Sequence, residues 1–226
     1  STTPSSAYDP SRRQFFYTIG AGILGAAMLK FVPQVLGKVK SLLRPPGSTD
    51  STIESKCIRC GECVRVCPTG AIQPAASVAA WEDTWTPQLV MRQGYCDYSC
   101  NACGKICPSG AIQPLELEQK RLFIIGKAQI DESRCIPFVQ GVECTVCEEA
   151  CPVPGKAIKL SLETVTNIYG EQSTVLIPRV QRGHCIGCGI CETKCPVYGE
   201  AAIRVYTSSE TGQTGQGNGQ QRRGNR

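Results

Sequence analysis

The sequence has little of what catalysis by side chains alone would require. It contains a single histidine, and only 6% of its residues are aromatic. No set of serine, histidine and aspartate, no phosphate-binding loop and no nucleotide-binding fingerprint can be recognised. Few aromatic side chains also predict a thin apolar core. We therefore expect no catalytic site of the chain's own, and a fold that depends on something besides apolar burial.

The chain also has only a small excess of charge of one sign. The chain has 24 Lys and Arg residues against 19 Asp and Glu residues, which gives a formal net charge of +5. Three of the positive charges, Arg222, Arg223 and Arg226, lie at the very end of the sequence. Because no basic patch with interleaved aromatic residues is present, nucleic acid is not an expected partner.

Cysteine, in contrast, is abundant and strictly ordered. All 16 cysteines lie within residues 57–206, in four groups of four that each end in Cys-Pro. The octapeptide CPTGAIQP at residues 67–74 returns as CPSGAIQP at residues 107–114, which indicates an internal repeat. The groups are Cys57, Cys60, Cys63 and Cys67; Cys96, Cys100, Cys103 and Cys107; Cys135, Cys144, Cys147 and Cys151; and Cys185, Cys188, Cys191 and Cys195.

The spacing of these groups is typical of iron–sulfur cluster ligands. The first and fourth groups follow the pattern C-x2-C-x2-C-x3-C-P, as in bacterial ferredoxins that bind [4Fe–4S] clusters. Three thiolates on one short loop can hold one cube, and in two-cluster ferredoxins the fourth cysteine binds the other cube. We predict that all sixteen cysteines are ligands of four [4Fe–4S] clusters. Cys96 and Cys135 are each followed by an irregular gap; if one of them does not bind, that site could hold a three-iron cluster.

Disulfides and zinc sites are two other possible uses of the cysteines. Sixteen cysteines could form eight disulfides, but disulfide frameworks rarely repeat one four-cysteine spacing along a chain. Zinc sites use paired C-x2-C knuckles, and a third cysteine two residues further on exceeds what a tetrahedral site needs. The repeated spacing therefore favours iron–sulfur clusters over both.

The expected fold class is α+β, with tandem pseudo-symmetric modules of the bacterial-ferredoxin type, in which small sheets and short helices surround the clusters. The segment between the second and third groups resembles the strand–turn–strand of a single two-cluster ferredoxin. The segment between the first two groups, which contains WEDTW, resembles an insertion. We therefore favour pairing the second group with the third and the first with the fourth. The alternative pairs the first with the second and the third with the fourth.

Outside the cysteine-rich region, the chain divides by composition. Residues 1–14 are polar and contain a twin arginine in SRRQFF, and residues 15–37 are mostly apolar. Residues 38–56 read as a linker, residues 57–206 as a four-cluster ferredoxin domain, and residues 207–226 as a disordered tail rich in Gly and Gln. The twin-arginine pattern is typical of an export signal for folded proteins.

The apolar segment is long enough to remain as a membrane anchor. As a helix, residues 15–36 would extend about 33 Å, against a hydrocarbon core of about 30 Å. No convincing cleavage site precedes the linker, so we expect a retained single-span transmembrane helix, with the cluster domain on the periplasmic side of the inner membrane. A plain anchor that leaves the clusters in the cytoplasm remains the alternative, and Lys38, Lys40 and Arg44 count slightly toward it.

Together, the twin-arginine start and the cysteine groups resemble the ferredoxin-type proteins of the NapG/MauM kind. The third group and its continuation, CIPFVQGVECTVCEEACP and CIGCGICETKCP, carry the resemblance most specifically. The resemblance implies four [4Fe–4S] clusters, a periplasmic location and electron transfer from membrane quinol. It also implies two partners: an integral-membrane, quinol-interacting subunit, and a redox enzyme or cytochrome. The short gap between Cys100 and Cys103 and the Gly/Gln-rich tail depart from the family pattern and leave the partner open.

From the sequence we therefore expect an electron-transfer protein. The main hypothesis is a membrane-anchored relay between a quinol-linked membrane partner and a periplasmic redox partner. The second is the iron–sulfur subunit of a cytoplasm-facing hydrogenase- or dehydrogenase-type complex. A third, an iron or redox sensor, would need a switchable output domain, and the sequence contains no recognisable one.

Overall fold

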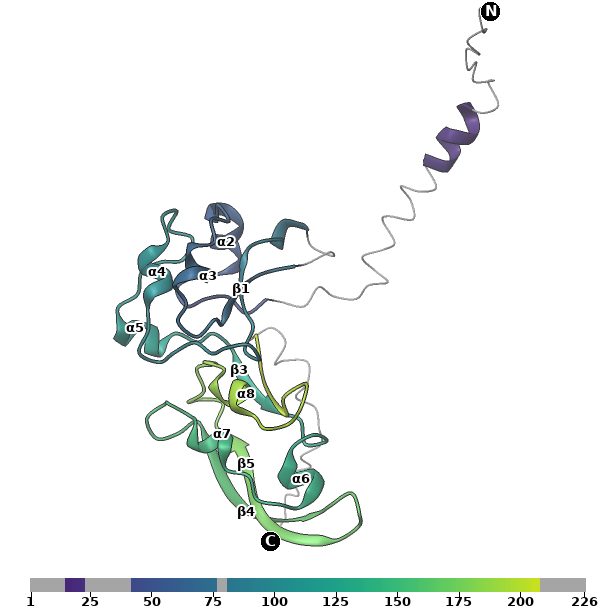
Figure 1. The fold of residues 1–226 in the computed structure, drawn as a ribbon, viewed down its shortest axis with the longest axis vertical. Helices are drawn as coiled ribbons and strands as arrows, with labels where there is room; N and C mark the ends of the chain where they lie inside the picture. Colours follow the sequence, from purple (N-terminus) through teal and green to yellow (C-terminus); the bar gives the residue numbers. More distant parts are fainter. Residues whose placement is uncertain (1–14, 23–41, 77–80, 208–226) are drawn as a thin grey trace, which may run out of the picture. The chain divides into compact units, whose positions relative to one another are not determined.

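The computed structural model describes residues 15–22, 42–76 and 81–207. Residues 15–22 are helical (purple in Figure 1) and belong to a compact unit separate from the one that holds all the cysteines. Within the described ranges, the structure contains no helix with the length and apolar character needed to cross a membrane. Most of the predicted anchor at residues 15–37, and the predicted tail beyond Thr207, lie outside the described residues.

The cysteine-containing unit has two halves, each with short helices and small sheets (Figure 1). The first half, residues 42–122, contains α2 (Asp50–Lys56), α3 (Glu62–Val66), β1 (Ile72–Pro74), the 3-10 helix η1 (Trp81–Asp83), β2 (Pro87–Leu89), α4 (Ala102–Ile106) and α5 (Leu117–Leu122). The second half, residues 127–207, contains β3 (Lys127–Ile130), α6 (Ile136–Gln140), α7 (Val146–Glu149), β4 (Ile158–Thr166), β5 (Gln172–Val180), α8 (Ile190–Lys194) and β6 (Ile203–Tyr206).

Three antiparallel strand pairs organise the halves. In the first half, β1 pairs with β2, with Ile72 opposite Leu89. In the second half, β3 pairs with β6, with Ile130 opposite Ile203, and β4 and β5 form a long hairpin. The β3–β6 pair joins the segment before the third cysteine group to the segment after the fourth group. It therefore closes the second half around these two groups.

The Cys-Pro pairs explain where the ligand helices end. Cys67, Cys107 and Cys195 are the C-cap residues of α3, α4 and α8, with ψ angles of 109°, 109° and 124°. A residue that precedes proline is driven from the helical region toward such extended angles by clashes with the proline ring. The repeated Cys-Pro therefore stops each helix and turns the last cysteine away from its own loop.

The Ala-Ile pairs that follow each Cys-Pro belong to the core. The isoleucines Ile72, Ile112, Ile158 and Ile203 are between 1% and 3% exposed, and the alanines before them are equally buried. Three of these isoleucines begin a strand, and Ile112 packs in a loop with Ile53. Small alanines beside isoleucines leave room for the cysteines, which complete a core that has few aromatic residues.

The prediction of a linker over residues 38–56 is wrong for residues 42–56. Arg44 is only 7% exposed, and its guanidinium donates to Asp50, Asp83, Thr86 and the carbonyl of Pro87. Thr49 caps α2, which buries Ile53 against the first half. Pro46-Gly47 is typical of a loop, but it does not indicate where that loop packs. The partners of Arg44 lie mostly far along the chain, so they leave no local sequence pattern.

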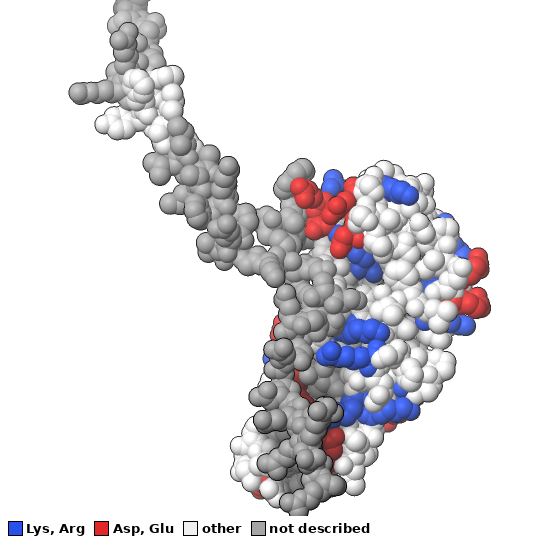
Figure 2. Space-filling model, turned by 180° about the vertical axis from the view of Figure 1, so that it is seen from behind, with Lys and Arg blue, Asp and Glu red and all other residues white. Residues whose placement is uncertain are grey.

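The surface of this unit carries mixed charge. In Figure 2, Lys and Arg side chains and Asp and Glu side chains each lie in several separate groups, with uncharged areas between them. Several opposite charges are paired, such as Arg179 with Glu132 and Glu163 at 3.0 and 2.6 Å. The face shown presents no continuous band of one sign.

Candidate iron–sulfur centres

The sixteen cysteines line four separate cavities, four to each cavity. We name them sites A to D. Site A contains Cys57, Cys60, Cys63 and Cys107; site B contains Cys67, Cys96, Cys100 and Cys103; site C contains Cys151, Cys185, Cys188 and Cys191; and site D contains Cys135, Cys144, Cys147 and Cys195. The irregular gaps after Cys96 and Cys135 do not remove either residue from its site.

This arrangement contradicts the pairing that we favoured from the sequence. The last cysteine of the first group, Cys67, lies with the second group, and Cys107 lies with the first. The third and fourth groups exchange Cys151 and Cys195 in the same way. The alternative, first with second and third with fourth, is therefore the observed one. The apparent insertion forms β1, η1 and β2, which lie within the first half instead of separating two modules.

The chemistry of each cavity fits a cubic cluster. The four cavities are similar in size, and each is lined by four cysteines. All sixteen cysteines are free thiols. Over the described ranges, no three His, Cys, Asp or Glu side chains converge as they would around one metal ion. Four thiols spread around a cavity suit the separate irons of a [4Fe–4S] cluster better than a single zinc ion.

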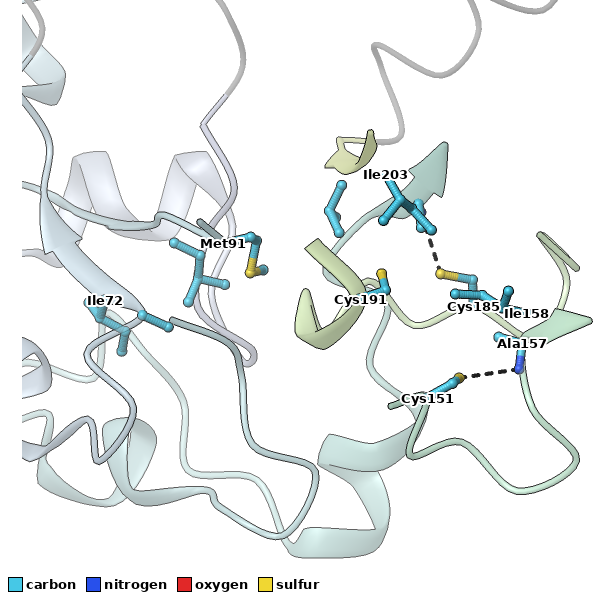
Figure 3. Packing of buried hydrophobic residues seen from close by; sticks show 12 residues of the cluster. Ile72, Met91, Cys151, Ala157, Ile158, Cys185, Cys191 and Ile203 are labelled. Atoms are coloured by element: carbon cyan, nitrogen blue, oxygen red, sulfur yellow. Dashed lines mark hydrogen bonds between the residues drawn. The ribbon is translucent and has the colours of Figure 1, made fainter. Parts of the chain in front are cut away.

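Backbone amides point at several of the sulfurs. The amide of Ala157 donates to Sγ of Cys151 at 3.3 Å, and that of Ala128 donates to Sγ of Cys185 at 3.4 Å (dashed lines in Figure 3). In the first half, the amide of Ile112 lies 3.5 Å from Sγ of Cys107. Such hydrogen bonds stabilise negative charge on thiolate ligands and are a means of adjusting a cluster's reduction potential.

Burial of several thiols together disfavours their charged form when iron is absent. Burial, followed by repulsion from neighbouring cysteines, raises the pKa of Cys63 to about 11 and of Cys103 to about 12. The same causes raise the pKa values of Cys135 and Cys147 to about 12. Iron binding must therefore displace protons from these sites, and the metal charge offsets the repulsion among the thiolates.

The two crossing ligands of the first half behave differently. Burial alone would raise the pKa of Cys67, but hydrogen bonds from Thr69 and from backbone amides outweigh it and lower the pKa. At Cys107, the amide of Ile112 and the hydroxyl of Ser109 likewise overcome burial. The repeated octapeptide therefore supplies a crossing ligand together with the donors that stabilise its thiolate.

Neighbouring sites are close enough to influence one another electrostatically. After burial and the cysteines of its own site, Cys63 of site A also raises the pKa of Cys103 in site B. In the same manner, Cys96 of site B acts on Cys188 of site C, and Cys147 of site D acts on Cys191 of site C. These electrostatic interactions link site A with B, B with C, and C with D.

Some supporting residues were missed by sequence reasoning. Lys120 is 2% exposed, and its ammonium donates to the carbonyl of Asp97 beside Cys96 of site B. Lys127 donates to the carbonyls of Arg182 and Cys185 near site C. No motif marks these lysines, because each is defined by carbonyls that the fold brings to it.

Family models match all four cysteine groups. A 4Fe-4S binding domain matches residues 51–73, a 4Fe-4S dicluster domain matches residues 95–155, and a second 4Fe-4S binding domain matches residues 182–199. The dicluster match spans the second and third groups, which the structure assigns to different halves. We assign the cysteines by the cavities, because the ligands of one cluster must line one cavity. A match to a family model reflects only the order of the cysteines along the chain.

Sequence similarity to known proteins covers most of the chain. A methylamine utilization ferredoxin-type protein, MauM, of Methylobacillus flagellatus is 32% identical over 214 residues, which are 89% of this chain and 86% of the relative. MauM of Methylophilus methylotrophus is 33% identical over 87% of both chains. The ferredoxin-type protein NapG of Escherichia coli is 38% identical over 147 residues, which are 64% of this chain and 62% of the relative.

The cysteine spacing, the thiol-lined cavities and the similarity over most of the chain agree in one assignment. This chain belongs to the NapG/MauM family of ferredoxin-type iron–sulfur electron-transfer proteins.

Proposed function

We propose that this chain is a membrane-anchored electron relay that carries four [4Fe–4S] clusters. In this proposal, it passes electrons between a quinol-linked integral-membrane partner and a periplasmic redox enzyme or cytochrome. The observation that carries the proposal is the presence of four thiol-lined sites within one compact unit, with the amide of Cys96 in site B donating to the carbonyl of Cys188 in site C. Such an arrangement suits transport of electrons through the protein better than storage at one centre.

When bound, a [4Fe–4S] cluster supplies reversible one-electron oxidation and reduction. The chain's own residues set the conditions for this exchange. Cysteine thiolates hold the irons, and Ala-Ile pairs such as Ala71-Ile72 exclude water from the core. Amides such as those of Ala128 and Ala157 donate to the sulfurs. Sites A and D, at the two ends of the succession, are where exchange with partners is expected.

The cellular part of the proposal rests on the sequence. The SRRQFF pattern followed by the apolar residues 15–37 supports export of a folded, cluster-loaded protein that remains anchored. The names of the MauM relatives associate those proteins with methylamine utilization. For this chain, the donor and acceptor are proposed by class alone.

Protease accessibility in intact spheroplasts tests the location. We expect external protease to digest the 57–206 region before the inner membrane is lysed, while a cytoplasmic marker protein remains intact. Protection until lysis would overturn the periplasmic assignment. It would instead favour the iron–sulfur subunit of a cytoplasm-facing hydrogenase- or dehydrogenase-type complex.

A further inference from the structure

We propose that electrons cross between the two halves through the hydrogen bond between Cys96 and Cys188, and that Arg92 is the positioning residue that fixes this crossing. The inference rests on the proposed relay function. It adds the place where the relay passes from one half to the other, and the side chain that determines the geometry there.

The contact joins a ligand of site B directly to a ligand of site C. The amide of Cys96 donates to the carbonyl of Cys188 at 2.8 Å. The path from one sulfur to the other therefore follows the backbone of each cysteine and crosses a single hydrogen bond. Cys188 is 8% exposed, so protein surrounds the far end of this path.

Arg92 holds the two halves together at the same place. From the first half, its Nη1 donates to the carbonyls of Glu192 and Cys195, both at 3.0 Å, and its Nη2 donates to the carbonyl of Val197 at 2.6 Å. These carbonyls lie at and beyond the C-terminal end of α8, where a positive charge is favourable. Because α8 carries Cys191 of site C and ends at Cys195 of site D, one side chain positions both ligand segments.

We call the region around Arg92 and the Cys96–Cys188 hydrogen bond the junction. Close packing in this region restricts movement of the two halves against each other. Met91 is 2% exposed, and its carbonyl accepts from the hydroxyl of Thr193 at 2.6 Å. A Cβ atom added at Gly189 would lie 2.2 Å from the sulfur of Met91. In Figure 3, Met91 lies between Ile72 of the first half and Cys191 of the second. Close packing of this kind fixes the separation of the groups on either side.

Clusters held by the cysteines of sites B and C would supply a one-electron donor on one side of this path and a one-electron acceptor on the other. No covalent bond forms or breaks, no proton needs to move and no further reactant is required. Arg92 donates only to backbone carbonyls, so its role is to position the path and not to carry the electron.

The test uses the full, iron-loaded chain with Arg92→Gln and Arg92→Lys, and Arg179→Gln as the matched control. Arg179 is an exposed arginine of the second half that pairs with Glu132 and Glu163 at 3.0 and 2.6 Å, within that half. The measurements are iron content, the magnetic interaction between reduced clusters, and the rate of internal electron redistribution after a short photoreduction pulse.

We expect Arg92→Gln to retain the wild-type iron content, to weaken the magnetic interaction across the junction and to slow redistribution severalfold. Arg92→Lys should recover part of the rate, and Arg179→Gln should leave both the magnetic interaction and the rate unchanged. Wild-type interaction and rate in an iron-loaded Arg92→Gln protein would overturn the inference.

If Arg92→Gln fails to load iron, a second variant tests the same crossing. Thr193→Val removes the hydroxyl that donates to Met91 but preserves the shape of the side chain. It should retain the clusters and shift both junction readouts in the same direction, and unchanged readouts would again overturn the inference. If the wild-type chain itself lacked clusters at sites B and C, the proposed relay would fail, which is distinct from a relay that is insensitive to Arg92.

Discussion

At the scale of single residues, three cations determine much of this protein: Arg44 and Lys120 are buried, and Arg92 is half-buried. Arg44, Arg92 and Lys120 have no shared motif, yet each donates to oxygen atoms that distant segments supply. A buried charge is tolerated only when such partners satisfy it. These cations therefore hold together loops that, without iron, have little apolar core of their own.

Lys120 should adjust the reduction potential of site B. Its buried ammonium lies beside Cys96, and a nearby positive charge favours the more negative, reduced form of a cluster. We expect Lys120→Met to lower the midpoint potential of one cluster and to leave the others in place. A potentiometric titration followed by electron paramagnetic resonance measures this, with the exposed Lys105→Met as control. Identical potentials in both variants would refute the role.

Arg44 should stabilise the first half strongly. Removal of its side chain leaves Asp83 and the 2% exposed Thr86 without their buried partner. Loss of one member of a buried ion pair typically costs about 3–5 kcal/mol. We expect this loss of unfolding free energy for Arg44→Ala, seen as a lower urea midpoint by circular dichroism.

Arg65→Ala provides the control for Arg44. Arg65 forms an exposed pair with Glu62 at 3.0 Å, and such pairs contribute about 0–1 kcal/mol. Similar midpoints for Arg44→Ala and Arg65→Ala would show that the buried network contributes little to stability.

At the scale of elements, the ligand helices are too short to be stable alone. α3, α4 and α8 have five residues each and α7 has four, well below the length at which isolated helices form. Their ends are set by local chemistry, with glycine at the start of α3 and α8 and Cys-Pro at the end. Their stability must therefore come from the packing and the metal centres around them.

The glycines that precede α3 and α8 should differ in their tolerance of substitution by alanine. Gly61 and Gly189 have φ angles of +76° and +82°, so alanine at either position costs roughly 1–2 kcal/mol in backbone strain. A Cβ at Gly61 would meet open space, whereas at Gly189 it would press on Met91. We expect Gly189→Ala to accelerate iron loss on heating more than Gly61→Ala does. Equal rates would argue against close packing at the junction.

At the scale of the whole molecule, the decisive feature is the exchange of crossing ligands within each half. Cys67 and Cys107 exchange sites in the first half, as do Cys151 and Cys195 in the second. Each half is thereby tied together through two thiol-lined sites. The junction at Arg92 then joins the halves into a succession of four sites.

Double cysteine variants test this exchange. The structure places Cys67 and Cys100 in site B and Cys188 in site C. Cys67→Ser with Cys100→Ser should therefore lose the iron of one cluster, about four atoms per chain. Cys67→Ser with Cys188→Ser should lose about twice as much. The pairing of the first group with the fourth predicts the reverse order, so iron analysis with Mössbauer spectroscopy distinguishes them.

The inventory of candidate ligands can be read from the sequence alone. The spacing within each group is local, since three thiolates must lie on one short loop to hold one cube, and this spacing is readable without a fold. The Cys-Pro pairs and the buried Ala-Ile pairs act over only a few residues, so they also follow from the sequence. The family resemblance rested on the same local patterns and was confirmed by the relatives.

The tertiary structure alone decided which groups share a site. The gap from Cys67 to Cys96 is almost as long as the gap from Cys107 to Cys135, so chain length did not distinguish the two pairings. The pairing of β3 with β6 encloses the third and fourth groups together, and that contact joins residues far apart in sequence. The same reason hid the folding of residues 42–56 and the roles of Arg44, Arg92 and Lys120. Their partners are backbone carbonyls and side chains from distant segments, and a carbonyl has the same chemistry whatever residue carries it.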